Sequence, residues 1–145
     1  MSAQAKTAKG QCLCGDVRFT VALKNTHLDA CHCSYCRAWC GGGPFLGVSC
    51  AEPPVFESEE AVGVYSSSEW GERVFCKNCG STLFWRMKDG SSVSASAGVL
   101  DLGNEADLTL QIFVDEKPAY YKFANKTKMM TGAEVFAQFA GGQEG

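Results

Sequence analysis

Short cysteine clusters constrain this chain more than any other feature of its sequence. Seven of the nine cysteines fall into three clusters, which are Cys12-x-Cys14, Cys31-His-Cys33-Ser-Tyr-Cys36 and Cys76-x-x-Cys79. Two cysteines separated by one or two residues can hold a metal ion from one tight turn, and two such pairs complete a tetrahedron. The first and third clusters together therefore predict a closed, four-cysteine structural site. The middle cluster keeps three thiolates, which would leave one coordination position open for water or substrate.

The bulk composition is that of an ordinary globular protein of one domain. The chain has 145 residues, of which 46% are hydrophobic and 20% charged, so it can bury a core of its own. Its formal charge is −3 and no basic run is present, which argues against a nucleic-acid partner. No apolar run approaches the roughly 20 residues that span a bilayer, so no membrane partner is expected.

The cysteines are expected to be reduced thiols rather than disulfides. The first residues contain no apolar segment typical of a signal peptide, which predicts a cytoplasmic location. Disulfides are rare in that compartment, and nine is an odd number of cysteines. Metal binding or thiol reactivity is therefore favoured over cross-linking.

The hydrophobic pattern predicts a mainly β fold with a short C-terminal helix. Apolar residues alternate from Val17 to Leu23, which is typical of a half-buried strand. Further short strands are predicted at 45–50, 63–65, 73–75, 82–86, 92–97, 108–114 and 119–122. Thr131-x-x-Glu134 fits a capping box and predicts the start of the helix. We expect a loose tail over 1–9 and a single domain over 10–145.

Three segments, in the right order, carry a family resemblance. They are Gly10-x-Cys12-x-Cys14-Gly15-x-Val17, Cys31-His-Cys33-x-x-Cys36-Arg37 and Arg73-x-Phe75-Cys76-x-x-Cys79-Gly80. This pattern resembles the glutathione-dependent formaldehyde-activating enzyme family. The resemblance implies a tent of short antiparallel strands pinned by a structural zinc. It also implies a reaction that joins glutathione and formaldehyde to S-hydroxymethylglutathione, which is the reverse of a carbon–sulfur lyase reaction.

The resemblance assigns a role to each cysteine cluster. It implies that the structural zinc is held by Cys12, Cys14, Cys76 and Cys79. It implies a second zinc, associated with activity and more easily lost, on Cys31, Cys33 and Cys36. Three thiolates and one zinc ion carry a net charge of −1, so activating a thiol is the more plausible role than making hydroxide.

Two arginines are candidates for binding the carboxylates of glutathione. Arg37 follows the last cysteine of the triplet, and Arg73 precedes the third cluster. The planar guanidinium group suits a carboxylate, although a surface position or an ion pair explains either residue equally well.

Some residues near the triplet leave the interpretation open. Cys40 would close the site if it were a fourth ligand, and otherwise it is a small buried residue. His32 lies between two cysteines, and in an extended backbone its side chain should point away from their metal. We expect Cys50 in the core. The segment 115–121 is distinctive, but the sequence predicts no chemistry for it.

Three functions are consistent with these features. The first is a zinc-dependent carbon–sulfur lyase or synthase acting on a thiol–aldehyde adduct, with glutathione and formaldehyde as the default pair. The second is a glutathione carrier without catalysis, and the third is a structural domain in which both clusters only hold the fold together. The sequence does not identify the true substrate, the occupancy of the second zinc or the oligomeric state.

Overall fold

A long strand, β2 (Arg18–Cys31), contributes to both parts of the molecule. The computed structural model describes residues 6–140. Contacts divide these residues into unit 1, which is 6–26 and 47–106, and unit 2, which is 27–46 and 107–140. Strands β2 and β3 (Phe45–Cys50) each begin in one unit and end in the other, so the two units share strands. The single domain predicted over 10–145 stays a prediction.

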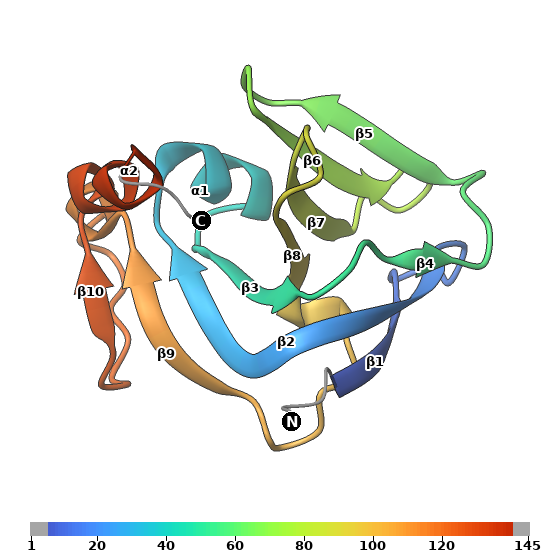
Figure 1. Cartoon of the computed structure of the whole chain (residues 1–145), viewed down its shortest axis with the longest axis horizontal. Coiled ribbons are helices and arrows are strands. Elements are labelled where there is room, and N and C mark those ends of the chain that lie inside the picture. Colours follow the sequence, from blue (N-terminus) through green and yellow to red (C-terminus); the bar gives the residue numbers. More distant parts are fainter. Residues whose placement is uncertain (1–5, 141–145) are drawn as a thin grey trace. The chain divides into compact units, whose positions relative to one another are not determined.

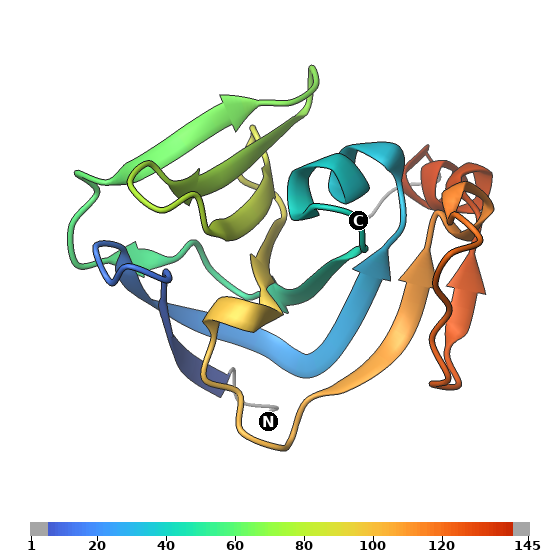
Figure 2. The ribbon, with the colours of Figure 1, turned by 180° about the vertical axis from the view of Figure 1, so that it is seen from behind.

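Unit 1 is a set of antiparallel strands. Strands β8, β7, β6 and β5 are neighbours in that order, β3 pairs with β8, and β1 and β4 both pair with β2. Their bounds are β1 Lys6–Gln11, β4 Val55–Phe56, β5 Val62–Ser66, β6 Gly71–Cys76, β7 Thr82–Met87 and β8 Val93–Ser96. A 3₁₀ turn, η1 (Ala97–Val99), follows β8 and lies beside β1 in Figure 2.

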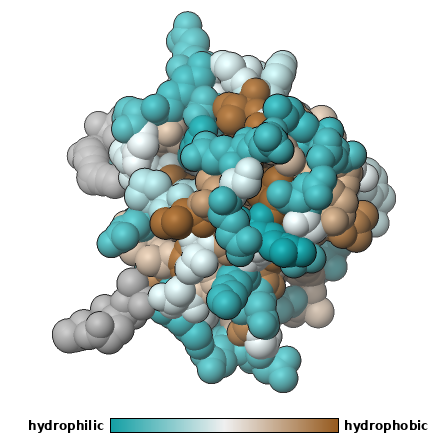
Figure 3. Space-filling model, turned by 90° about the vertical axis from the view of Figure 1, so that its right-hand side faces the viewer, coloured by the Kyte–Doolittle hydropathy of each residue, from teal (hydrophilic) through white to brown (hydrophobic). Residues whose placement is uncertain are grey.

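The core of unit 1 is built from the alternating residues of β2. Phe19, Val21 and Leu23 are almost completely buried, as the period of two predicts. The ring of Phe19 meets that of Phe84 edge-on at 4.8 Å, and Phe56 completes the cluster. Fully burying a large apolar side chain contributes about 1.5–3 kcal/mol, so this cluster contributes to the stability of unit 1. The face seen in Figure 3 is mostly hydrophilic, with separate apolar patches.

Unit 2 contains parallel strands, which the sequence pattern did not predict. The last part of β2 pairs with β9 (Asp107–Ile112), and β9 pairs with β10 (Lys128–Met130). All three arrows point the same way in Figure 1. Helix α1 (Ser34–Cys40) follows β2, a 3₁₀ turn η2 (Val114–Glu116) follows β9, and helix α2 (Gly132–Ala140) follows β10.

The mainly β fold with a short C-terminal helix is confirmed. Helix α2 begins with the predicted capping box: Glu134 N donates to Thr131 Oγ1 at 3.2 Å, and Thr131 N donates to Glu134 Oε1 at 2.7 Å. No helix in residues 6–140 is long and apolar enough to cross a membrane.

Two local predictions are wrong, and one helix was not predicted. The tail predicted over 1–9 is too long, because Lys6–Gln11 form β1 and pair with β2. The strand predicted at 119–122 is a loop, held by side chains rather than by a strand partner. The sequence reading also missed α1, whose seven residues are too few to show a helical period.

Candidate metal centres

The first centre lies in unit 1 and consists of the two outer cysteine pairs. The sulfurs of Cys12, Cys14, Cys76 and Cys79 all lie within 4.8 Å of one another. Four sulfurs around zinc, each about 2.3 Å from the ion, would be separated by about 3.8 Å. The Cys12–Cys14 and Cys14–Cys76 sulfur distances are 3.6 and 3.7 Å. The donor set therefore fits a tetrahedral metal ion with four cysteine ligands.

The backbone turns at this centre are formed by the sequence around each pair. Val17 N lies 3.2 Å from the sulfur of Cys12, and Cys79 N lies 3.4 Å from that of Cys76, so amides donate to both thiols. Gly80 follows with a φ of 80°, a left-handed conformation that a glycine adopts without strain. These turns explain why the third cluster ends in glycine.

The second centre lies in unit 2, where β2 ends and α1 begins. The sulfurs of Cys31, Cys33 and Cys36 also lie within 4.8 Å of one another. Cys31 is the last residue of β2, and Cys33 caps the N-terminus of α1, where its sulfur accepts from Cys36 N at 3.4 Å. The same turn that starts the helix thus gathers the three thiols. Gly41 ends the helix with a φ of 85°.

The electrostatics of the triplet favour a bound cation. Contacts with Cys33 and Cys36, together with burial, raise the pKa of the Cys31 thiol far above its usual range. Three thiolates so close together repel one another, and a divalent cation removes that repulsion. The donor set is soft and anionic, which suits zinc.

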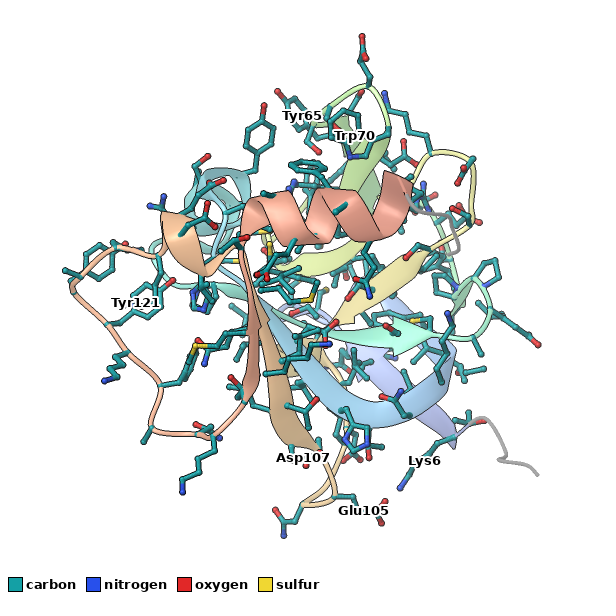
Figure 4. The ribbon with its side chains drawn as sticks, turned by 60° about the vertical axis from the view of Figure 1, so that its left-hand side comes forward. Lys6, Tyr65, Trp70, Glu105, Asp107 and Tyr121 are labelled. Carbon is teal, nitrogen blue, oxygen red and sulfur yellow. The ribbon has the colours of Figure 1, made fainter. Side chains whose placement is uncertain are left out.

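His32 and Cys40 are both outside this sulfur group. The His32 side chain is fully buried, with Nε2 lying 2.8 Å from Gln111 Oε1 and Nδ1 lying 2.7 Å from the hydroxyl of Tyr121. Burial lowers the pKa of His32, and the nearby charges of Lys117 and Arg37 act in the same direction. The ring is therefore a neutral, hydrogen-bonded group facing β9. Figure 4 shows Tyr121 on the loop that leads to β10.

The two candidate arginines belong to different units. Arg37 lies in α1 and is half-buried, and its Nε donates to the backbone oxygen of His32 at 3.0 Å. Arg73 lies in β6 of unit 1, where it is buried. A role for either in binding a substrate carboxylate stays a prediction. Cys50 is buried in the core of unit 1, as expected.

Gln111 and Tyr121, the partners of His32, were not predicted from the sequence. Both are far from the cysteines along the chain. Gln111 is buried in the structure. In the sequence it is a polar residue within a predicted apolar strand, and this was the one signal available beforehand.

The chain is similar to several known proteins. The model of the glutathione-dependent formaldehyde-activating enzyme family matches residues 7–116. An uncharacterized lyase of Schizosaccharomyces pombe is 40% identical over 128 residues, which cover 88% of this chain and 93% of that protein. A Halomonas elongata protein named for the same enzyme family is 34% identical over 84 residues, covering 52% of this chain and 54% of that one.

A solved structure supports the fold. The crystal structure of a Rhodobacter sphaeroides protein matches with a TM-score of 0.57 and 21% sequence identity, covering 70% of this chain and 99% of that one. The family match spans both cysteine centres and most of the described strands. The chain therefore belongs to the glutathione-dependent formaldehyde-activating enzyme family.

Proposed function

We propose that this chain is a zinc-dependent carbon–sulfur lyase or synthase that acts on a thiol–aldehyde adduct, with glutathione and formaldehyde as the first pair to test. Membership of the family and the lyase name of the S. pombe relative support this class of reaction. In the same proposal the protein works in the cytoplasm on small molecules, and neither nucleic acid nor a membrane is a partner.

The observation that carries the proposal is the incomplete ligand set of the triplet. Cys31, Cys33 and Cys36 form a group of three, and neither His32 nor Cys40 joins it. Zinc in proteins takes four ligands, so three protein ligands leave a position for a substrate. The other centre has four cysteines and is suited to a structural role. A fold that only needed two structural zinc ions would have no reason to leave one of them open.

The reaction itself is a balanced addition. The thiol sulfur forms a bond to the carbonyl carbon, the carbon–oxygen double bond becomes a single bond, and the proton lost by the thiol ends on the new hydroxyl. A zinc ion at the triplet would lower the pKa of the substrate thiol and polarise the carbonyl. The reverse direction breaks the same bond, and neither direction needs an oxidant or a reductant.

The protein residues then have the task of binding and orienting the thiol. Arg37 follows Cys36 directly, and its Nε is already fixed on the backbone oxygen of His32. Its guanidinium group carries further N–H donors, which can bind a carboxylate of glutathione. We propose Arg37 for this contact, and Arg73 as the second candidate.

The test is formaldehyde–glutathione exchange followed by NMR. Exchange is measured without protein, with the zinc-loaded protein and with the Cys36→Ser variant, while Cys40→Ser serves as the matched control. Faster exchange that is lost in Cys36→Ser and kept in Cys40→Ser is the expected result. Glutathione signals that broaden without faster exchange would instead favour a carrier. If the protein changed neither rate nor line width, the proposal for this substrate pair would be wrong.

A further inference from the structure

The residue between the first two cysteines of the triplet is held at every polar atom. His32 Nε2 and Nδ1 meet Gln111 and Tyr121, its backbone N donates to Ile112 O at 3.0 Å, and its backbone oxygen accepts from Arg37. Cys31 and Cys33 are its direct neighbours in the chain. Fixing His32 therefore fixes the backbone on which two of the three sulfurs are carried.

The hydrogen-bond network determines which nitrogen of His32 carries the proton. The side-chain amide nitrogen of Gln111 donates to Thr127 Oγ1 at 2.9 Å, so its oxygen faces the imidazole. An oxygen is only an acceptor, and Nε2 must then be the protonated nitrogen. Nδ1 is left as an acceptor for the hydroxyl of Tyr121, at 2.7 Å.

The segment Glu116–Tyr121 holds the same stretch at two further points. Glu116 Oε1 accepts from Ser34 N at 2.8 Å, at the start of α1. The hydroxyl of Tyr120 donates to the backbone oxygen of Gly42 at 2.6 Å, just beyond the end of α1. One short loop thus contacts the cysteine segment at three places: at His32, before α1; at Ser34, where α1 begins; and at Gly42, after α1 ends.

The loop is itself held in shape. Lys117 Nζ donates to the backbone oxygens of Pro118 and Tyr121 and lies 5.1 Å from the centre of the Tyr121 ring. The chain enters η2 through Phe113, whose φ of 55° is unusual for a residue other than glycine. Such a conformation is strained and persists only where the surroundings enforce it. The edge-on contact of the Phe113 and Phe136 rings, at 5.6 Å, is one such restraint.

We propose that Glu116–Tyr121 is a clamp that pre-organises the three-cysteine centre, with Tyr121 and Gln111 as positioning residues that act through His32. Without such restraint, the spacing of the three sulfurs would be free to change when no metal is bound. The clamp keeps the three sulfurs at a spacing that suits the ion, and it holds the His32 imidazole away from that position. This inference rests on metal binding at the triplet in the proposed function, but not on the reaction.

The test measures Co²⁺ binding by the full-length protein, without any substrate. Thiolate-to-cobalt absorption is recorded during competition with a chelator, and Cys36→Ser supplies the spectrum of the four-cysteine centre alone. Tyr121→Phe removes one hydroxyl and keeps the ring, and Glu116→Ala removes the second contact at an exposed position. Tyr65→Phe is the matched control, since Tyr65 lies in unit 1 and is exposed. Figure 4 shows its side chain at the hairpin of β5 and β6.

Tyr121→Phe is expected to weaken Co²⁺ binding at the triplet by about 10–100-fold, with Glu116→Ala weakening it less and Tyr65→Phe not at all. The ¹⁵N signals of His32 should show the Nε2–H form in the native protein. His27 is the chain's other histidine and provides an internal reference. Unchanged Co²⁺ binding in both variants would overturn the inference, as would equal loss at both centres. Turnover is not a readout here, so an inactive native protein would contradict the proposed function alone.

Discussion

The hydroxyl oxygen of Ser81 lies 3.2 Å from the sulfur of Cys79. The same oxygen accepts a hydrogen bond from the backbone N–H of Leu13 at 2.9 Å, so one side chain contacts both cysteine turns of the four-cysteine centre. Hydrogen bonding by Ser81 is the main reason that the pKa of Cys79 falls to about 5. Since the thiolate is the form that binds metal, Ser81 favours the form of Cys79 that a metal ion at this centre would need.

Replacing Ser81 by alanine should therefore weaken metal binding at the four-cysteine centre. We expect a loss of about 10–100-fold in affinity, the usual effect of removing a partner of a metal ligand. The pKa of Cys79 should rise, so the loss should grow as the pH falls from 9 towards 5. Chelator competition at several pH values measures this. Ser92→Ala, in the turn between β7 and β8, is the control, and equal affinities for the two variants would contradict the prediction.

The two cysteine groups should differ in what their loss does to folding. Cys79→Ser removes a ligand of the closed centre, where metal binding of the order of 10 kcal/mol contributes directly to the free energy of folding. Cys36→Ser removes one sulfur from the group of three that lies where β2 ends and α1 begins. It should lower the melting temperature far less than Cys79→Ser does. Thermal unfolding of both zinc-loaded variants measures the difference. Equal losses of melting temperature would mean that both centres are structural.

Local sequence patterns were sufficient to predict the short cysteine clusters as units and the main strands. The spacing of cysteines places two thiols in one turn, and the alternation from Val17 to Leu23 needs only the period of a strand. The capping box at Thr131 is likewise a contact between residues three apart. Each of these features depends on neighbours in the chain, which is why the sequence alone was enough; the meeting of Cys14 with Cys76, 62 positions apart, instead depends on the fold.

Long-range partners could not be predicted in this way. The bond between His32 and Tyr121 joins residues 89 positions apart, and that between His32 and Gln111 spans 79 positions. The parallel pairing of β2 with β9 brings Gln111 to His32, and the loop after η2 brings Tyr121 to it; no local pattern indicated either arrangement. The segment after η2 was read as a strand for the same reason. Its residues Tyr120 and Tyr121 contact the cysteine segment and have no strand partner.

Cys50 should be an unreactive thiol whose titration appears only at high pH. Burial raises its pKa from 9.0 to about 11. At pH 8 its thiolate fraction should be about 100-fold lower than that of an unfolded cysteine, so iodoacetamide should leave it unlabelled in the native protein. The neutral form is favoured by folding, so its contribution to stability is complete below pH 9 and is lost between pH 9 and 11.

The control for Cys50 is the same titration in Cys50→Ala. The variant should be less stable overall because it leaves a cavity, but its stability should lack the part of the decline between pH 9 and 11 that this thiol causes. Rapid labelling of native Cys50 at pH 8, identified by mass spectrometry, would contradict the assignment.

Replacing Cys40 tests whether the three-cysteine centre has an open coordination position. It lies at the end of α1, four residues after Cys36, yet it is outside the group formed by the other three sulfurs. Cys40→Ser should therefore keep the metal content, the Co²⁺ spectrum and the exchange rate of the native protein, whereas Cys36→Ser should lose one metal ion per chain. Adding a small thiol to the Co²⁺-loaded protein should shift the thiolate-to-cobalt band, because a fourth sulfur would occupy the open position. If Cys40→Ser lost the metal and added thiol left the band unchanged, the centre would have four protein ligands and no place for a substrate.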